Sequence, residues 1–329
     1  MRVLSLFDGM SCGQIALSRA GIPVESYRAS ELDKYAITVT QANYPETVQM
    51  GDVTKWREWD IDWSSIDLLI GGSPCQGFSF AGNQLAFEDP RSKLFFVYVD
   101  ILNHIRSLNP GVKFLLENVR MKKEFLDVIS DQVGVEPVFI NSALVSAQNR
   151  QRYYWANWEF GLPEDKEIML KDILEDGVVD RDKGHCIDAN YFKGGNLKSY
   201  FEKNRRQLVF NSASIVGRRL TDEGKRNDKL ATKPIQCLEV QETGKSRCLS
   251  TVSKDAVVSP LPGGRYPGSK DYRKLTPLEC ERLQTVPDGY TAHVSNTQRY
   301  KMLGNGWTVD VIAHIFKALE EAQDENSSL

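Results

Sequence analysis

The stretch that decides the fold is residues 66–79, which run Ile-Asp-Leu-Leu-Ile-Gly-Gly-Ser-Pro-Cys-Gln-Gly-Phe-Ser. The short apolar run at its start predicts a buried strand. Two glycines then free the backbone, and Pro74 fixes its own φ directly before Cys75. A cysteine on a turn at the carboxyl end of a parallel strand lies where open α/β sheets bind ligands. From this stretch alone, a nucleophilic Cys75 and a small buried cysteine that fills space are equally well supported.

The composition is that of a globular chain with one large domain or two ordinary ones. Its 329 residues are 41% hydrophobic and 26% charged. No apolar run approaches the roughly 20 residues of a membrane helix. A first strand that begins at Val3 leaves no room for a targeting peptide, so we expect an intracellular, cytoplasmic protein. Six cysteines without a Cys-x-x-Cys pair, and four scattered histidines, argue against a disulfide framework and a metal site.

The amino-terminal residues have the pattern of a nucleotide-binding unit. Residues 3–7 predict a strand, 8–13 a glycine-bearing turn, and 14–20 a helix that Gly21 ends. Strand, glycine turn and helix open many α/β units whose ligand lies near the helix N-terminus. The glycine spacing is not that of the dinucleotide fingerprint.

Acidic residues follow the next strands. A second strand over 25–30 ends before Glu31, which is placed to accept hydrogen bonds from ribose hydroxyls. The alternative is an acid at the N-terminus of the following helix. A third strand over 48–53 carries Asp52, which suits an adenine amine.

The second half of the sheet carries a carboxylate and three more polar side chains. Glu117 ends a buried run and must therefore meet a partner or a ligand, although it could instead cap the next helix. Gln148, Arg150 and Arg152 alternate, which places them on one face of an extended segment. The elements expected around them are a helix over 91–108, a strand over 114–119, a helix over 121–129 and strands over 138–145 and 153–158.

Residues 159–274 have a looser pattern, and part of this segment is basic. Between Lys193 and Lys233 there are eleven Lys and Arg against four Asp and Glu, while the whole chain carries a net charge of −3. A basic segment in an otherwise acidic chain indicates a polyanion-binding surface, and a solvated loop is an equally good interpretation.

Regular structure returns near the carboxyl end. Thr276, Pro277 and Glu279 predict a helix start with a capping box. An amphipathic helix is expected over 308–322. We therefore expect one domain formed by residues 1–158 and 275–329, with a smaller loop-rich domain over 159–274.

These motifs, taken in order, resemble those of the cytosine-5 DNA methyltransferases. The match is closest to bacterial and phage members, with some likeness to the animal de novo branch. The resemblance implies an α/β, Rossmann-like methyltransferase sheet with a loop-rich target-recognition domain. The motifs that carry it are Phe7-Asp8-Gly9-x-Ser11-x-Gly13, Glu31, Asp52, Gly72-Ser73-Pro74-Cys75-Gln76, Glu117-Asn118-Val119, Gln148-x-Arg150-x-Arg152, residues 275–284 and Gly304-Asn305.

The resemblance also implies the ligands and their sites. S-adenosylmethionine is the expected methyl donor, S-adenosylhomocysteine its product, and double-stranded DNA the partner, with no metal, no membrane and a monomeric enzyme. The implied cofactor-binding residues are Phe7, Asp8, Gly9, Ser11, Cys12, Gly13, Glu31, Leu32, Asp52, Val53, Ser73, Pro74, Asn305, Trp307 and Thr308. The expected DNA-binding residues are Gln76, Ser79, Arg91 and Gln148, together with Arg205, Arg206, Arg218 and Arg219 of the basic segment.

The chemistry of cytosine agrees with four catalytic residues. Carbon 5 is a poor nucleophile until a thiolate adds to carbon 6, and Cys75 supplies that thiolate. Glu117 would stabilise the charge at ring nitrogen 3, either protonated or sharing a proton there. Arg150 and Arg152 would hold the base oxygen and orient Glu117. The target base must be flipped out of the duplex, and the loop over 77–91 is expected to close over it.

Two departures from the family pattern concern the carboxyl-terminal motifs. Gly306-Trp307 stands where many members have a small residue and a valine, and Thr285-Val286-Pro287 replaces an expected Gly-Phe-Pro. The first departure leaves the shape of the methyl-donor pocket undetermined. The second leaves undetermined how the last motif supports the target-recognition domain.

Three other functions are alternatives to DNA methylation. A cytosine-5 transfer RNA methyltransferase would share the pocket and the chemistry. A catalytically inactive paralogue is disfavoured by the intact Cys75, Glu117 and Arg152. A nicotinamide dehydrogenase is disfavoured by the glycine spacing and the Pro-Cys turn.

Overall fold

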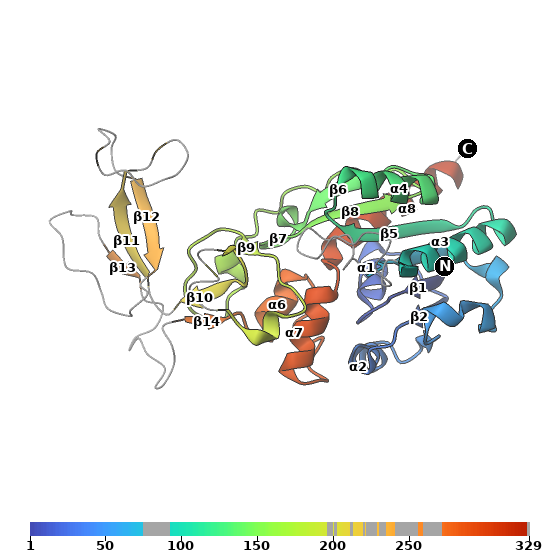
Figure 1. The fold of residues 1–329 in the computed structure, drawn as a ribbon, viewed down its shortest axis with the longest axis horizontal. Coiled ribbons are helices and arrows are strands. Elements are labelled where there is room, and N and C mark those ends of the chain that lie inside the picture. The colour runs from blue at the N-terminus through green and yellow to red at the C-terminus, as the bar shows by residue number, and fades with distance from the viewer. Residues whose placement is uncertain are drawn as a thin grey trace.

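A seven-stranded mixed sheet forms the centre of the molecule (Figure 1). The computed structural model describes residues 1–74, 93–195, 200, 203–210, 213–219, 221, 229, 235–240, 256–258 and 272–327. The strand order is β3-β2-β1-β4-β5-β8-β6. The strands are β1 Arg2–Leu6, β2 Ser26–Ser30, β3 Val48–Gln49, β4 Leu68–Gly71, β5 Lys113–Val119, β6 Val138–Asn141 and β8 Gln151–Ala156. The first five strands in this order pair in parallel, and β8 runs antiparallel to both β5 and β6.

Two apolar clusters cover the two faces of the sheet, as the alternation along its strands requires. In β4, Leu68 and Ile70 point into one cluster and Leu69 into the other. The first cluster contains α1, α6, α7 and α8, and the second contains α3 and α4. The helices are α1 Cys12–Ala20, α2 Lys34–Asn43, α3 Lys93–Leu108, α4 Lys123–Val133, α6 Pro277–Leu283, α7 Asn296–Asn305 and α8 Val309–Ser327. The buried, nearly continuous apolar strands are those of a doubly covered sheet.

The chain reverses its direction of travel across the sheet at β1. It passes from β1 outward to β2 and β3, then returns to place β4 on the other side of β1. Leu6 is in register with Gly71, and Gly71 with Leu116. The residues that follow these three therefore emerge at one edge, which is where open α/β sheets bind ligands.

The segment between β10 Leu208–Phe210 and β14 Tyr272–Lys274 extends away from the main sheet, and the two strands that flank it pair antiparallel with each other. Between them, β11 Ala213–Arg218, β12 Ile235–Val240 and β13 Ala256–Val258 form a separate antiparallel sheet, at the left of Figure 1. Two-residue strands β7 Gln148–Asn149 and β9 Gly184–His185 pair in parallel nearer the main sheet. Leu170, Ile173 and Tyr191 pack in the same cluster as α6–α8, so the start of the second domain at residue 159 stays a prediction.

Most of the expected elements occur, with some differences in extent. Gly21 ends α1 at φ 81°, and Thr276 and Glu279 form the expected capping box of α6. The strand expected over 138–145 ends at Asn141, because the Asn141 side chain accepts from the backbone N–H groups of Ala143 and Arg150 and starts a turn. The third strand is only two residues long, and a 3₁₀ segment, Val53–Glu58, follows it. Helix α7 was not expected, since its sequence is largely polar.

Candidate functional site

The turn after β1 is formed by residues in the left-handed backbone region. Phe7, Gly9 and Ser11 have φ values of 57°, 60° and 59°. The Asp8 carboxylate accepts hydrogen bonds from the Tyr27 hydroxyl at 2.7 Å and from the Ser11 hydroxyl. Burial raises the pKa of Asp8 to about 6, and these hydrogen bonds oppose that rise. Asp8 therefore organises the turn, and no sequence motif indicated its partner Tyr27.

Glu31 joins the end of β2 to the same turn. Its Oε2 accepts from the Gly9 N–H at 2.8 Å, and its Oε1 accepts from the Leu32 and Asp33 N–H groups, each at 2.7 Å. A carboxylate has about four acceptor positions, so one remains on Oε2 for a ligand hydroxyl. Leu32, beside it, is 69% exposed.

Asp52 lies at the next strand end. Its Oδ1 accepts from the Thr54 N–H at 2.9 Å and the Thr54 hydroxyl at 2.8 Å, and these bonds lower the pKa of Asp52. Val53 is buried directly after it. The expected cofactor acceptors Glu31 and Asp52 thus follow two paired strands, β2 and β3.

A carboxylate, a guanidinium and an indole meet at the carboxyl edge of the sheet. Glu117 comes from β5, Arg152 from β8, and Trp307 from the segment between α7 and α8. The Arg152 Nε lies 2.8 Å from Oε1 of the buried Glu117. The Trp307 Nε1–H donates to Oε2 of Glu117 at 3.1 Å. A Cβ added at Gly72 would lie 2.9 Å from Glu117 Oε2 and 3.0 Å from Trp307 Nε1, so this contact needs glycine at position 72.

The loop that follows β4 begins in a fixed position. The Asn118 Nδ2–H donates to the Ser73 hydroxyl at 3.2 Å, a contact that the sequence did not indicate. This bond ties the loop before Pro74 to the end of β5, next to Glu117. Cys75, Gln76, Ser79 and Arg91, and with them the expected lid, lie outside the described residues.

Arg150 does not lie where its expected role requires. Its guanidinium is 3% exposed and donates to the carbonyl oxygens of Ile187, Gly304 and Gly306 at 3.2, 3.3 and 2.8 Å, and to Cys186 Sγ at 3.3 Å. These contacts occupy N–H groups of the Arg150 guanidinium within the fold. The expectation that Arg150 holds the base oxygen and orients Glu117 is therefore corrected: in this arrangement Arg150 supports the 304–306 segment, and Arg152 alone of the two pairs with Glu117.

Gln148 requires a similar correction. It is completely buried, and its Nε2 donates to the Leu283 carbonyl at 2.8 Å and to Gln284 Oε1 at 2.9 Å. It joins β7 to the end of α6 and has no surface to offer DNA. The alternation of residues 148–152 was correct for extended backbone, but β7 and β8 turn the side chains toward different neighbours.

The residues after α7 pack against the turn that follows β1. The Cys12 thiol donates to the Trp307 carbonyl at 3.8 Å, and a Cβ added at Gly306 would lie 3.0 Å from Met10 Cε. The Thr308 hydroxyl donates to Gln284 Oε1 at 3.0 Å, whereas Asn305 is exposed. Burial raises the pKa of Cys12 to about 12, which makes this thiol a poor nucleophile.

Two arginines of the basic segment, Arg205 and Arg206, have partners in the fold. Arg205 lies 3.2 Å from Asp188, and Arg206 donates to the Gly194 carbonyl at 2.8 Å. Arg218 ends β11, and Arg219 follows it. Their contact with DNA stays a prediction.

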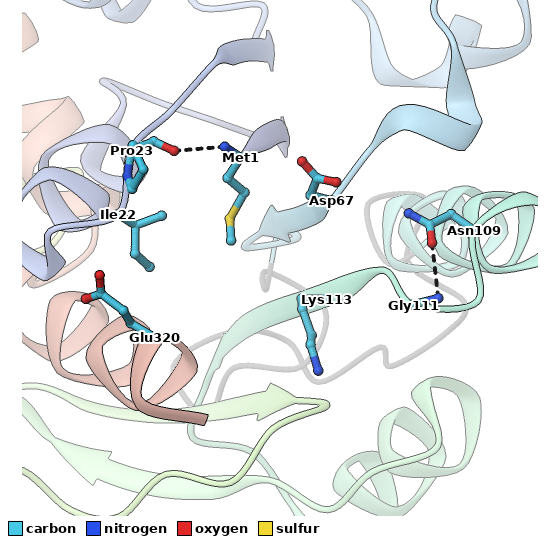
Figure 2. A pocket seen from close by; sticks show the side chains of 8 residues that line it. All are labelled: Met1, Ile22, Pro23, Asp67, Asn109, Gly111, Lys113 and Glu320. Atoms are coloured by element: carbon cyan, nitrogen blue, oxygen red, sulfur yellow. Dashed lines mark hydrogen bonds between the residues drawn. The ribbon is translucent and has the colours of Figure 1, made fainter. Parts of the chain in front are cut away.

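A hollow of about 430 Å³ opens at the other end of the sheet (Figure 2). Asp67 and Lys113, which precede or begin β4 and β5, line it. The Asp67 carboxylate already accepts from the Arg2 N–H at 2.7 Å. The hollow is therefore separated from Glu117 by the length of the strands.

The described residues offer neither a metal site nor a membrane-spanning helix. Among those residues, no group of three or more His, Cys, Asp or Glu could hold a metal ion. No helix within them is long and apolar enough to cross a membrane.

Known proteins resemble this chain over nearly its whole length. The family model for C-5 cytosine-specific DNA methylases matches residues 1–321. The orphan methyltransferase M.SPRI of Bacillus phage SPR is 28% identical, with 97% of each chain covered. The type II methyltransferase M.HhaI of Haemophilus parahaemolyticus is also 28% identical, over 96% of this chain and 93% of the relative.

Solved structures show the same fold at low sequence identity. The Entamoeba histolytica methyltransferase EhMeth superposes with a TM-score of 0.63 at 16% identity, and 98% of each chain is covered. A DNA modification methyltransferase encoded within an E. coli prophage superposes with a TM-score of 0.56 at 20% identity, over 98% of this chain and 99% of that one.

Proposed function

Because the chain belongs to the C-5 cytosine-specific DNA methylase family, we propose that it transfers the methyl group of S-adenosylmethionine to carbon 5 of cytosine in duplex DNA. The observation that carries the proposal is the buried Glu117, paired with Arg152 at the edge of the sheet where the loop bearing Cys75 begins. A carboxylate and a guanidinium in this position suit the ring nitrogen and the oxygen of a flipped cytosine.

The residues at the ends of β1 to β4 fit S-adenosylmethionine. When bound, this cofactor supplies a methyl group on a positively charged sulfur. Glu31 would offer its remaining acceptor position to the ribose hydroxyls, and Asp52 with Val53 would hold the adenine. Phe7 would stack on the adenine, and residues 9–13 would bind the methionine end. Gly72 keeps this edge of the sheet free of a side chain that would meet Glu117 and Trp307.

In the proposed mechanism, the chain's own residues prepare the cytosine. The Cys75 thiolate adds to carbon 6, which makes carbon 5 nucleophilic. A proton shared between Glu117 and nitrogen 3 stabilises the negative charge that develops there, and Arg152 holds both Glu117 and the base oxygen. Carbon 5 takes the methyl group, which leaves S-adenosylhomocysteine as one product. A base such as water then removes the carbon 5 proton, and the Cys75 thiolate leaves carbon 6 to release 5-methylcytosine.

The wider setting is proposed on likeness to the relatives. The domain over 159–274 would recognise the DNA sequence through its basic residues. The relatives named above come from a bacterium and a phage, so we place the activity in the cytoplasm of a bacterial cell or a phage-infected host, with or without a restriction enzyme. We propose that the enzyme acts as a monomer without a metal.

A tritium-transfer assay tests the substrate. Purified protein and labelled S-adenosylmethionine are incubated with duplex DNA and, separately, with transfer RNA. We expect label in 5-methylcytosine of DNA. Label in RNA alone would instead support the transfer RNA alternative, which neither relative named above favours. Bisulfite sequencing of DNA from expressing cells would then give the recognised sequence.

A further inference from the structure

We propose that Trp307 is a positioning residue for Glu117, which it holds by donating its indole N–H to Glu117 Oε2. This inference rests on the proposed function, in which Glu117 stabilises the activated cytosine. It assigns Trp307 a part in the chemical step, in addition to its expected contact with the cofactor.

The two oxygens of Glu117 are held by different elements. Arg152, on β8, lies 2.8 Å from Oε1, and Trp307, between α7 and α8, donates to Oε2 at 3.1 Å. A carboxylate with a contact on each oxygen cannot turn freely about its last bond. The carboxyl group is therefore fixed in one plane before a base arrives, and such preorganisation is an efficient way to stabilise developing charge.

The backbone on both sides of the Trp307 Cα is held by hydrogen bonds. The preceding Gly306 carbonyl accepts from Arg150 at 2.8 Å and from Gln284 Nε2 at 3.1 Å. The Trp307 carbonyl accepts from the Cys12 thiol at 3.8 Å. The buried Arg150, which does not contact Glu117 in this arrangement, thus acts on it through the segment that carries Trp307.

Gly72 makes room for the indole, since a Cβ there would lie 3.0 Å from Nε1. At the other end of the ring, a Cβ at Gly13 of α1 would lie 3.8 Å from Cζ3, an ordinary contact distance. The ring therefore extends from the start of α1 to Glu117. Valine, the residue that many family members have at this position, carries no N–H on its side chain, so the hydrogen bond depends on tryptophan here.

The first test measures the hydrogen bond without using catalysis. In the full-length protein labelled with ¹⁵N at tryptophan, the Trp307 indole signal is identified by its loss in Trp307→Phe. We expect its N–H to exchange slowly with solvent in the wild type and at least about tenfold faster in Glu117→Ala, because the acceptor is gone. The Trp158 indole, which donates to the Ile315 carbonyl at 3.0 Å, is the internal control and should not change. Unchanged exchange of Trp307 in Glu117→Ala would overturn the proposal.

The second test separates positioning of Glu117 from cofactor binding. Trp307→Phe keeps an aromatic ring and removes the donor, so we expect kcat to fall by about tenfold with the Kd for S-adenosylmethionine nearly unchanged. In a Glu117→Ala background the same substitution should cause no further loss. Trp158→Phe, a matched change in the core, should leave kcat per folded molecule unaltered.

The possible failures can be told apart. A weaker Kd with an unchanged kcat would show that Trp307 only lines the cofactor pocket, and equal losses in both backgrounds would show that it acts independently of Glu117. Absence of methyl transfer by the wild type to either DNA or transfer RNA would refute the proposed function, while the exchange experiment would still report on the contact.

Discussion

Single residues at the carboxyl edge of the sheet form the proposed catalytic site. Glu117 is buried but has a partner at each oxygen, as a buried carboxylate requires. Asp8 is partly buried, and its hydrogen bonds serve the turn after β1. The two carboxylates therefore have separate roles, and variants at this scale should affect either the reaction or the stability of the fold.

Cys75→Ser should abolish methyl transfer and spare cofactor binding. A hydroxyl is a far weaker nucleophile than a thiolate, so we expect the rate to fall by roughly 10⁴-fold or more. The Kd for S-adenosylmethionine, measured by calorimetry, should stay within about twofold of the wild type. Cys186→Ser, at a half-buried free cysteine outside this edge, is the control. Full activity in Cys75→Ser would refute the covalent mechanism.

Asp8 should make the stability depend on pH. Its folded-state pKa of about 6 lies above the ordinary value of 3.8, so the folded protein binds the proton more tightly than the unfolded chain. The contribution is therefore present at low pH and is lost as pH rises from about 4 to about 6, by on the order of 2 kcal/mol.

Urea unfolding of the wild type and of Asp8→Asn at several pH values checks this. The substitution removes the titrating group, so other groups largely cancel in the difference between the two proteins. We expect the wild type to lose stability relative to Asp8→Asn between pH 4 and pH 6. A difference that is constant across this range would contradict the prediction.

At the scale of elements, Arg150 and Arg152 have separate functions although they are two residues apart. Arg150 joins three backbone carbonyls of other segments, and Arg152 pairs with Glu117 on the neighbouring strand. α7 also packs closely on residues 188–189, since a Cβ at Gly304 would lie 2.2 Å from the Asp188 carbonyl carbon. The packing of α7 thus helps to position residues 304–306, which precede Trp307.

Replacing each arginine by lysine should separate stability from catalysis. Arg150→Lys keeps the charge but cannot donate to all the carbonyls, so we expect unfolding to become easier by about 2–4 kcal/mol. Arg152→Lys should cost less stability and lower kcat by about tenfold. Urea unfolding and single-turnover kinetics of both variants measure this. Equal effects of the two substitutions on stability and kcat would show that their roles are not distinct.

At the scale of the whole molecule, the chain combines an acidic body with a basic insertion. Strands β11, β12 and β13 of the insertion lie in the chain between β10 and β14, which pair with each other. At its root, Arg273 pairs with Asp176 at 2.6 Å and with the fully buried Glu279 of α6 at 2.8 Å. This network fixes the base of the proposed DNA-recognition domain to the catalytic domain.

Replacing Arg205, Arg206, Arg218 and Arg219 by glutamine should weaken DNA binding and reduce its salt dependence. Each lost phosphate contact lowers the slope of log K against log salt by about 0.9. The control removes four charges elsewhere, by glutamine at the exposed Lys34, Lys55, Arg57 and Lys317. Fluorescence anisotropy at several salt concentrations measures both. An unchanged slope in the first variant would show that the basic segment is a solvated surface.

The sequence by itself determined most strands of the sheet, the helices that pack on it apart from α7, and the edge where we expect the site. Short apolar runs mark strands that are buried on both faces, and local signals such as Gly21 and the Thr276 capping box end or start helices. The order of short motifs was sufficient to indicate the family. Each of these features depends on residues that are close together in the sequence, so it can be predicted from the sequence alone.

Only the tertiary structure decided what several polar side chains contact. Arg150 meets carbonyls 154 and 156 residues away, and Gln148 meets Leu283, 135 residues away. Trp307, 190 residues from Glu117, departs from the family pattern in sequence, but its partner could not be inferred from that departure. A polar side chain takes the partner that packing brings within about 3 Å, and no local pattern records which distant segment that is.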